Sequence, residues 1–171
     1  MNHILETSRL KLRELESGDL DFIAEMLGNP DVMNYWPKSY SREEAKEWLL
    51  KQRERYQEHG FGYWLVLEKK MKQPVGQVGL MKTEIEGEEE IALGYIIHQP
   101  FWRKGYAFEA ASACINYGFK NLKAERVISL IRPENEPSQK VAQKLKMKPV
   151  GIKEFVGFKH LIFMIHNEDI D

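Results

Sequence analysis

The sequence predicts an α+β (α/β) domain built around a mixed β-sheet, and three observations point to this class. Apolar runs of strand length and helical apolar patterns follow one another in the order β-α-α-β-β-β-α-β-α-β-β. After residue 90, a strand, a helix and a strand succeed each other, which implies a right-handed crossover between two parallel neighbours. No linker, repeat or low-complexity segment interrupts the chain, so we expect one domain over residues 1–171.

Composition narrows the class of protein before any motif is considered. Hydrophobic residues make up 43% and charged residues 30% of the 171 residues, as in a globular protein with a sizeable core. The net charge of −1 favours neither a nucleic acid nor a membrane as partner, and no apolar run has the length of a membrane span or the pattern of a signal peptide. The single cysteine, Cys114, lies on the apolar face of a predicted helix and suits a reducing cytoplasm.

The N-terminal part of the chain is predicted to hold a strand and two capped helices. Residues 9–13 alternate in polarity as a strand does, and Ser17 is expected to cap a helix that ends at an Asn-Pro-Asp breaker. An aromatic loop follows, and then Ser41 and Glu44 form a capping box for a second helix that ends at Gly60. The apolar positions of the two helices are Leu20, Ile23 and Leu27, and Ala45, Trp48, Leu49 and Tyr56.

The middle of the chain is predicted to form three strands and a helix. Residues 61–68 and 75–83 are apolar runs of strand length. The charged segment 86–90 is expected to be the turn that leads into a strand at 91–97. A helix is then expected over residues 104–119. Its apolar face consists of Ala107, Ala110, Ala111, Cys114, Ile115 and Gly118.

The C-terminal part is predicted to add a strand, a short helix and a hairpin. Residues 126–131 read as a buried strand, and Asn135 is expected to cap a helix that tolerates a proline in its first turn. Residues 148–155 and 160–166 flank Gly157 and are expected to form a β-hairpin.

The most informative stretch lies between the fourth strand and the third helix, at residues 102–107. The first backbone N–H groups of a helix have no internal partner, and the helix dipole is positive at this end. Gly105 lets the backbone approach a bulky phosphate, and Arg103 and Lys104 add positive charge. The turn therefore predicts a cradle for a diphosphate, the alternative being a strand–turn–helix junction that binds nothing.

This turn and its surroundings resemble the GNAT superfamily of acetyl-CoA-dependent N-acetyltransferases, most closely its ribosomal-protein N-terminal (alanine/serine) acetyltransferase branch. The resemblance covers nearly the whole chain and rests on ordered segments at residues 93–97, 100–107, 109–110 and 135–138. It implies a GNAT-like, mostly antiparallel central sheet with helices on both faces. It also implies a splayed parallel strand pair that holds CoA.

The resemblance assigns CoA-binding roles to the strand–helix junction and to the last short helix. Backbone N–H groups of residues 103–107 would hold the diphosphate, and a backbone N–H at 95–97 would polarise the thioester carbonyl. Asn135 would bond the pantetheine arm, and Ser138 would lie near the sulfur. The expected CoA-binding residues are Tyr95, Ile96, Ile97, Trp102, Arg103, Lys104, Gly105, Tyr106, Ala107, Asn135 and Ser138.

Two positions depart from the superfamily pattern. Trp102 stands where Gln or Arg is usual, which is common in this branch and leaves the backbone cradle intact. Ala142 stands where many members carry a tyrosine that protonates the departing thiolate, and alanine cannot do this. Ser138 resembles the serine that some N-terminal acetyltransferases use instead, and support of Asn135 at the helix start is the other role open to it.

Acetyl transfer needs a neutral amine, and this bears on both the acceptor and the base. An α-amine of pKa about 8 is about one quarter neutral at about pH 7.5, whereas a lysine of pKa about 10.4 is only about 0.1% neutral. No residue stands out as a strong base, which favours an α-amine or another amine of low pKa. Glu88, Glu89 and Glu90 are the candidate catalytic bases, acting directly or through water, and a solvated acidic turn is the alternative for each.

We therefore expect an enzyme that transfers an acetyl group directly from acetyl-CoA, its co-substrate, to a primary amine such as the α-amine of a ribosomal or other protein. Tyr35, Trp36 and Glu88 are expected to contact the acceptor. A small-molecule amine acetyltransferase acting on polyamines or aminoglycosides stays open, as does a non-catalytic CoA-binding sensor. The five histidines show no metal-ligand spacing, so no metal is predicted, and the chain is expected to be a monomer or a homodimer.

Overall fold

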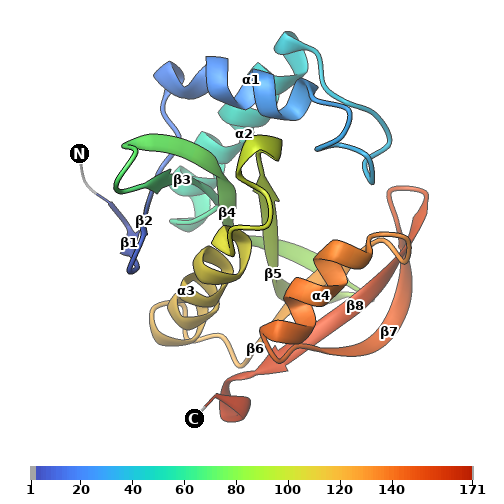
Figure 1. Ribbon diagram of the computed structural model, residues 1–171. Helices are drawn as coiled ribbons and strands as arrows, with labels where there is room; N and C mark the ends of the chain where they lie inside the picture. The colour runs from blue at the N-terminus through green and yellow to red at the C-terminus, as the bar shows by residue number, and fades with distance from the viewer. Residues whose placement is uncertain (1–2, 171) are drawn as a thin grey trace.

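The computed structural model describes residues 3–170, and within them one eight-stranded sheet carries four α-helices (Figure 1). The spatial order of the strands is β1-β2-β3-β4-β5-β6-β8-β7. The strands are β1 (Leu5–Glu6), β2 (Leu10–Arg13), β3 (Tyr63–Glu68), β4 (Gln73–Ile85), β5 (Glu88–Ile97), β6 (Arg126–Ile131), β7 (Lys148–Phe155) and β8 (Phe158–His166). The helices are α1 (Leu20–Gly28), α2 (Arg42–His59), α3 (Tyr106–Lys120) and α4 (Glu136–Lys144), with short 3-10 turns at Ser17–Asp19, Gln99–Phe101 and Asn167–Asp169.

The sheet is mixed because one pair of neighbouring strands, β5 and β6, runs parallel while the others run antiparallel. These two strands pair only at Ala92 and Ile128, so they diverge toward their carboxyl ends. Where they part, Ser129 Oγ donates a hydrogen bond of 3.0 Å to the carbonyl oxygen of Leu93. The predicted α+β class, a mostly antiparallel sheet with one parallel pair, is confirmed.

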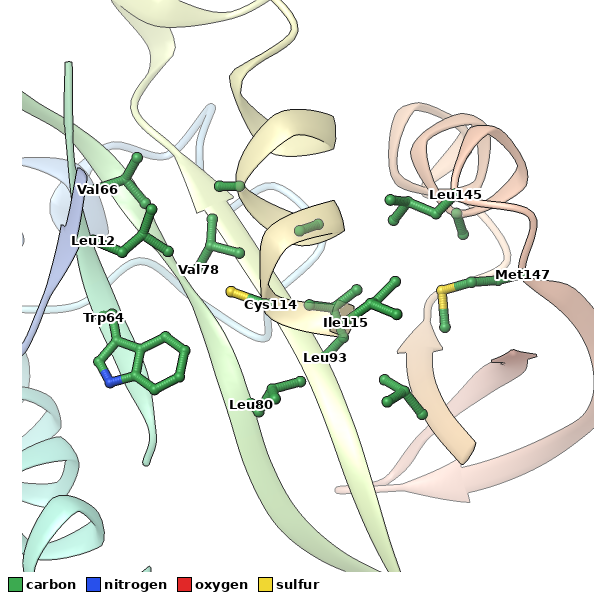
Figure 2. Close-up of a cluster of buried hydrophobic side chains, with 14 of the residues drawn as sticks. Leu12, Trp64, Val66, Val78, Leu80, Leu93, Cys114, Ile115, Leu145 and Met147 are labelled. Atoms are coloured by element: carbon green, nitrogen blue, oxygen red, sulfur yellow. The ribbon is translucent and has the colours of Figure 1, made fainter. Parts of the chain in front are cut away.

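Helices cover both faces of the sheet and bury a core on each. Helices α1 and α2 pack on one face, over residues such as Leu65 and Ile96. Helix α3 packs on the other face, where Cys114 and Ile115 share a cluster with Leu93 of β5 (Figure 2). The free thiol of Cys114 is fully buried, and this burial raises its pKa, so the cysteine belongs to the core.

Two predicted helix caps are present, and each follows from local side-chain chemistry. At the start of α2, Ser41 Oγ accepts from the N–H of Glu44 at 3.2 Å, and the Glu44 carboxylate accepts from the N–H of Ser41 at 3.4 Å. At the start of α4, Asn135 Oδ1 accepts from the N–H of Ser138 at 3.2 Å. Side-chain oxygens thus satisfy N–H groups that the helix itself leaves without partners.

The predicted cap at Ser17 is wrong. A 3-10 turn over Ser17–Asp19 precedes α1, and Asp19 rather than Ser17 is the N-cap residue of that helix. The reason is the Asp19 carboxylate, which accepts from the N–H of Glu16 at 2.7 Å and from the guanidinium of Arg13 at 2.8 and 2.9 Å. These bonds stabilise a tight turn before the helix proper.

Helix α3 begins two residues later than predicted, at Tyr106 instead of residue 104. Arg103 and Gly105 adopt φ angles of +61° and +80°, which lie in the left-handed region outside the right-handed helix. The segment that the sequence places in the first helical turn is therefore a loop that leads into the helix N-terminus.

The acidic segment 86–90 is a turn only at its start. Glu86 and Gly87 form that turn with φ angles of +52° and +83°, and β5 already begins at Glu88. Glu90 is buried and accepts a hydrogen bond from Arg126 of β6 at 3.0 Å, while the same guanidinium lies 2.9 Å from Glu88. Because Arg126 neutralises these carboxylates, the strand can begin inside an acidic run.

The predicted C-terminal hairpin is confirmed, with Phe155 opposite Phe158 and residues 156–157 in the turn. Strand β8 begins at Phe158, two residues earlier than predicted, and lies between β6 and β7. Strand β1 was not predicted, because a two-residue strand is too short to show a periodic pattern.

Candidate active site

A cavity of about 580 Å³ opens at the carboxyl end of β5, between the N-terminal ends of α3 and α4 and the loop after α1. Its volume falls within the range of about 300–1,000 Å³ that is usual for small-molecule sites. The loop before α3 and the start of that helix contribute Phe101, Trp102, Arg103, Gly105, Tyr106, Ala107 and Phe108. The remaining lining residues are Tyr95, Ile96 and Ile97 of β5; Asn135, Pro137, Ser138, Lys140, Val141 and Lys144 at α4; and Asp31, Val32, Tyr35 and Trp36 of the loop.

All predicted CoA-binding residues except Lys104 line this one cavity. Lys104 instead accepts a hydrogen bond from Arg9 Nη1 through its carbonyl oxygen at 2.8 Å, and its Nζ lies 5.8 Å from the centre of the Phe101 ring. Of the two basic residues in the turn, Arg103 is the one that lines the cavity.

The N-terminus of α3 meets the cavity with its first backbone N–H groups uncapped by a side chain. Gly105 is the N-cap residue, and Tyr106, Ala107 and Phe108 line the cavity. A Cβ atom added at Gly105 would lie 3.3 Å from Arg9 Nη2. Free N–H groups and the positive end of a 15-residue helix together form a site suited to an anion.

Trp102 holds the loop before α3 against the sheet. Its Nε1 donates a hydrogen bond of 2.7 Å to the carbonyl oxygen of Ile97, the last residue of β5. This bond ties the loop to the point where β5 and β6 have diverged. The tryptophan that departs from the superfamily pattern therefore braces the loop that leads to the N–H groups of α3.

Tyr95 and Ser138 form a reciprocal pair of hydrogen bonds on the other side of the cavity. Ser138 Oγ donates to Tyr95 Oη at 2.9 Å, and Tyr95 Oη donates to the carbonyl oxygen of Ser138 at 2.7 Å. Burial raises the pKa of Tyr95 to about 12, and the hydrogen bond from Ser138 opposes this only in part. The Tyr95 side chain thus points into the cavity, which its alternation in β5 could not decide.

Position 142, where many superfamily members carry a tyrosine, is part of the core in this protein. Ala142 is fully buried in the cluster on the α3 side of the sheet. The Tyr95–Ser138 pair places a phenol and an aliphatic hydroxyl next to the first turn of α4 instead. The cavity therefore has hydroxyl donors at this end although position 142 has none.

Two lysines of α4 that were not among the predicted site residues also line the cavity. Lys140 and Lys144 are four residues apart and so lie on one face of the helix. Lys144 Nζ is 4.4 Å from the centre of the Phe108 ring, which brings positive charge close to the start of α3. Their i, i+4 spacing behind the Asn135 cap is the signal that could have revealed them.

The predicted acceptor residues Tyr35 and Trp36 line the cavity together with Asp31, which was not predicted. Trp36 packs edge-on against Trp48 of α2, with ring centres 5.7 Å apart. Arg132, which follows β6, donates a hydrogen bond of 3.1 Å to the carbonyl oxygen of Tyr35 and so fixes the loop after α1 over the sheet. Aromatic rings beside one carboxylate suit a positively charged amine.

The three glutamates of β5 lie away from this cavity. They begin a ten-residue strand that is about 30 Å long, and the cavity lies at its other end. Glu88 and Glu90 contact Arg126, and Glu89 lies 3.2 Å from the Nζ atom of Lys82. Glu88, Glu89 and Glu90, the predicted acceptor contact and bases, are therefore not among the residues that line the cavity.

Within residues 3–170, no three His, Cys, Asp or Glu side chains are grouped in a way that could hold a metal ion. Across the same part of the chain, each helix is too short or too polar to cross a membrane. The polar groups that the cavity offers are backbone N–H groups, hydroxyls, the Asn135 amide, Asp31, Arg103 and two lysines.

The fold and the cavity define the class of protein: an α+β domain with a cavity of small-molecule size, in which the start of α3 can hold an anion. A family model described as an acetyltransferase (GNAT) domain matches residues 9–148. The chain therefore belongs to the GNAT family and is an N-acetyltransferase.

Relatives and solved structures agree with this assignment. The uncharacterized protein YkkB of Bacillus subtilis (strain 168) is 33% identical over 161 residues, which cover 88% of this chain and 94% of YkkB. The uncharacterized N-acetyltransferase YnaD of the same strain is 31% identical over 148 residues, which cover 86% and 84%. A GNAT-family acetyltransferase from Bacillus anthracis has a TM-score of 0.81 at 26% identity and covers 95% of this chain and 98% of its own.

Two further structures share the fold at lower identity. The ribosomal-protein-S5-alanine acetyltransferase from Vibrio fischeri has a TM-score of 0.78 at 22% identity and covers 98% of each chain. The spermidine N-acetyltransferase from Vibrio cholerae, solved with CoA and spermine, has a TM-score of 0.77 at 22% identity and covers 95% and 98%. At such identities the likeness is one of fold.

Proposed function

We propose that this N-acetyltransferase acts on the α-amine of a protein or peptide N-terminus, as in the ribosomal-protein N-terminal acetyltransferase branch. The observation that carries the proposal is the scarcity of candidate bases in the cavity: among the described lining residues, Asp31 is the single carboxylate. An α-amine of pKa about 8 needs little help from a base, whereas a lysine of pKa about 10.4 needs much. The buried free thiol of Cys114 suits a reducing compartment, so we place the enzyme in the cytoplasm.

The chemistry of the cavity fits acetyl-CoA. Backbone N–H groups at the start of α3, with Arg103 and Lys144 nearby, would hold the diphosphate. The oxygen of Asn135 caps α4, which leaves its –NH2 group as the donor for the pantetheine amide. Acetyl-CoA supplies the acetyl group as an activated thioester.

Ser138 would supply a proton to the departing thiolate from its Oγ atom. In the structure this hydroxyl donates to Tyr95 Oη, so its position is fixed by β5 as well as by α4. When Ser138 Oγ–H turns to the sulfur, Tyr95 Oη–H can turn from the Ser138 carbonyl to Ser138 Oγ, and both hydroxyls keep a hydrogen bond. The proton that the amine releases passes through solvent at the open side of the cavity to Ser138 Oγ, which restores the hydroxyl for the next turnover.

The Ser138→Ala variant is expected to lower kcat by about 100-fold, in the range found for general acids. The dissociation constant for CoA should change by no more than about twofold, because the Asn135 cap accepts from the backbone of residue 138 and remains intact. Steady-state kinetics and calorimetric titration measure the two quantities. Ser112→Ala, on α3 and outside the residues that line the cavity, is the matched control. An unchanged kcat in Ser138→Ala would reduce Ser138 to a structural role.

The pH dependence of kcat should show no ionisation of Tyr95 below about pH 10. Burial raises the pKa of Tyr95 to about 12, so the phenol keeps its proton, whereas an ordinary tyrosine of pKa about 10 would be half ionised at that pH. With an α-amine acceptor, kcat/KM is expected to rise to about pH 8 and then stay level. A decline of kcat between about pH 8 and about pH 10 that disappears in Tyr95→Phe would contradict the raised pKa of Tyr95.

A small cationic amine is the second candidate acceptor, and the wall formed by Asp31, Tyr35 and Trp36 favours it. A carboxylate beside aromatic rings attracts an ammonium group that has no peptide attached. The fold is also shared with the spermidine N-acetyltransferase from Vibrio cholerae. This candidate includes polyamines and aminoglycosides.

The test is the release of free CoA thiol with a panel of amines, run together with calorimetric titration of acetyl-CoA. The panel contains peptides with free α-amines, spermidine, aminoglycosides and free amino acids. Turnover with the peptides and little with the rest supports the proposal, and turnover with spermidine or aminoglycosides replaces it with the second candidate. Failure of acetyl-CoA to bind would contradict both.

A further inference from the structure

Arg9 lies immediately before β2 and reaches across to the start of α3. Its Nε donates to Glu109 Oε2 at 2.7 Å, and its backbone N–H donates to Glu109 Oε1 at 2.9 Å. Thr7 Oγ1 donates to the same Oε1 atom at 2.7 Å. The carboxylate of Glu109, one turn into α3, is therefore held by three donors from a segment about 100 residues away in the sequence.

The other side of the same guanidinium contacts the loop that leads into α3. Arg9 Nη1 donates to the carbonyl oxygen of Lys104 at 2.8 Å, and Arg9 Cζ lies 4.7 Å from the centre of the Tyr106 ring. Its Nη2 lies 3.3 Å from the position that a Cβ of Gly105 would occupy. One planar side chain thus contacts Lys104 and Tyr106 and lies beside Gly105, at the place where the uncapped N–H groups begin.

Trp102 braces the start of this loop, but no side-chain hydrogen bond caps its end at Gly105. Arg103 adopts a left-handed φ of +61°, a conformation that costs free energy in a residue other than glycine. The N-cap residue of α3 makes no side-chain hydrogen bond to the helix. The contacts from Arg9 are therefore the polar link that holds the loop to the N-terminal strands.

The charge of Glu109 gives Arg9 a second effect. Burial raises the pKa of this carboxyl, but hydrogen bonds from Thr7 and Arg9 outweigh burial and lower it overall, so the group is anionic. An anion one turn into α3 would repel a bound diphosphate if nothing neutralised it. Arg9 neutralises it and leaves the backbone N–H groups of α3 free for a ligand.

We propose that Arg9, acting through Glu109 and the carbonyl of Lys104, is a positioning residue that holds the start of α3 in the geometry required by the CoA diphosphate. The inference rests on the proposed binding of acetyl-CoA in this cavity. Arg9 does not itself line the cavity, so its effect on the ligand is transmitted by the loop. Because it acts on the diphosphate end, it should matter for CoA and not for the pantetheine arm.

The experiment compares the wild type with Arg9→Gln, Arg9→Lys and Glu109→Gln. Calorimetry gives the dissociation constant for CoA, and a ligand titration followed by NMR gives that for S-acetylpantetheine, which has no diphosphate. We expect Arg9→Gln to weaken CoA about tenfold, because a cradle displaced by less than an ångström loses much of its hydrogen bonding. Binding of S-acetylpantetheine should stay within about twofold of the wild type.

The lysine and glutamine variants separate positioning from charge. Lysine keeps the positive charge but lacks the planar fork that reaches both Glu109 and the Lys104 carbonyl, so Arg9→Lys should resemble Arg9→Gln. Glu109→Gln keeps the size of the side chain, but its –NH2 group cannot accept the bond from Arg9 Nε. It should therefore weaken CoA if positioning matters, although it removes a negative charge close to the diphosphate. Arg42→Gln, which breaks an exposed ion pair with Asp21 away from the cavity, is the matched control and should leave CoA binding unchanged.

Each outcome decides one question. If the wild type fails to bind CoA, the proposed function itself fails. If the wild type binds CoA and Arg9→Lys binds it equally well, charge alone matters and the positioning role is overturned. Equal losses for CoA and S-acetylpantetheine would also overturn it, because they would show a general loss of structure, which thermal unfolding would detect.

Discussion

Gly105→Val is expected to abolish measurable binding of CoA, with a dissociation constant raised about 100-fold or more. Gly105 has a φ of +80°, which a β-branched residue adopts only with strain, and it directly precedes the N–H groups of α3. A valine side chain would also meet Arg9 Nη2, which lies 3.3 Å from the Cβ position. Calorimetric titration with CoA measures the effect.

The control for this variant is Gly87→Val in the turn between β4 and β5. Gly87 has a nearly identical φ of +83°, and a Cβ there would meet no atom within 4 Å. The backbone strain is therefore matched, while the cavity is at the other end of β5. Gly87→Val should lower Tm and leave CoA binding within about twofold of the wild type. Loss of CoA binding in both variants would show that strain, and not the cradle, is responsible.

Arg126→Ala is expected to destabilise the fold by about 2–3 kcal/mol, because it leaves the carboxylate of Glu90 buried without its partner. The side chain of Glu90 is only 7% exposed, and Arg126 Nε donates to it at 3.0 Å. The cost is below that of a fully buried pair, since the Arg126 side chain is 35% exposed. In a domain of this size the loss corresponds to a Tm lower by about 6 °C. Urea and thermal unfolding measure it.

The matched control is Glu88→Gln, which removes an exposed contact of the same guanidinium and should cost less than about 0.5 kcal/mol. If Arg126→Ala unfolds no more readily than this control, the buried ion pair is not a stabilising feature. Glu90→Gln tests the catalytic question separately. Its kcat should equal that of the wild type, and a hundredfold loss at unchanged Tm would restore a base role to this carboxylate.

Local signals account for the parts of the fold that the sequence predicts well. The capping box at Ser41 and Glu44 and the cap at Asn135 are present as expected, because side chain and backbone partner lie within three residues of each other. The hairpin at residues 148–166 follows from two apolar runs around a turn. The two parallel neighbours predicted from the crossover after residue 90 are β5 and β6.

The acidic segment shows where local reasoning fails. Five charged or small residues in a row resemble a solvated turn, and only the approach of Arg126 from β6, some 36 residues later, makes three of them part of a strand. A local sequence pattern does not show a contact with a residue that is distant in the chain. Arg126 thus holds Glu88 and Glu90 at the end of β5 that lies away from the cavity.

By itself, the sequence determined the order of the helices and of strands β2 to β8, the glycine turn that precedes α3, the Asn135 cap and the absence of a tyrosine at position 142. These depend on neighbours in the chain, so they can be read from spacing and residue type. The tertiary structure alone decided that Tyr95 points to Ser138, that Asp31, Lys140 and Lys144 complete the cavity, and that Arg9 holds the start of α3. The physical reason is that a strand can bury either face and a side chain can meet any partner, and the packing of distant segments selects among these possibilities.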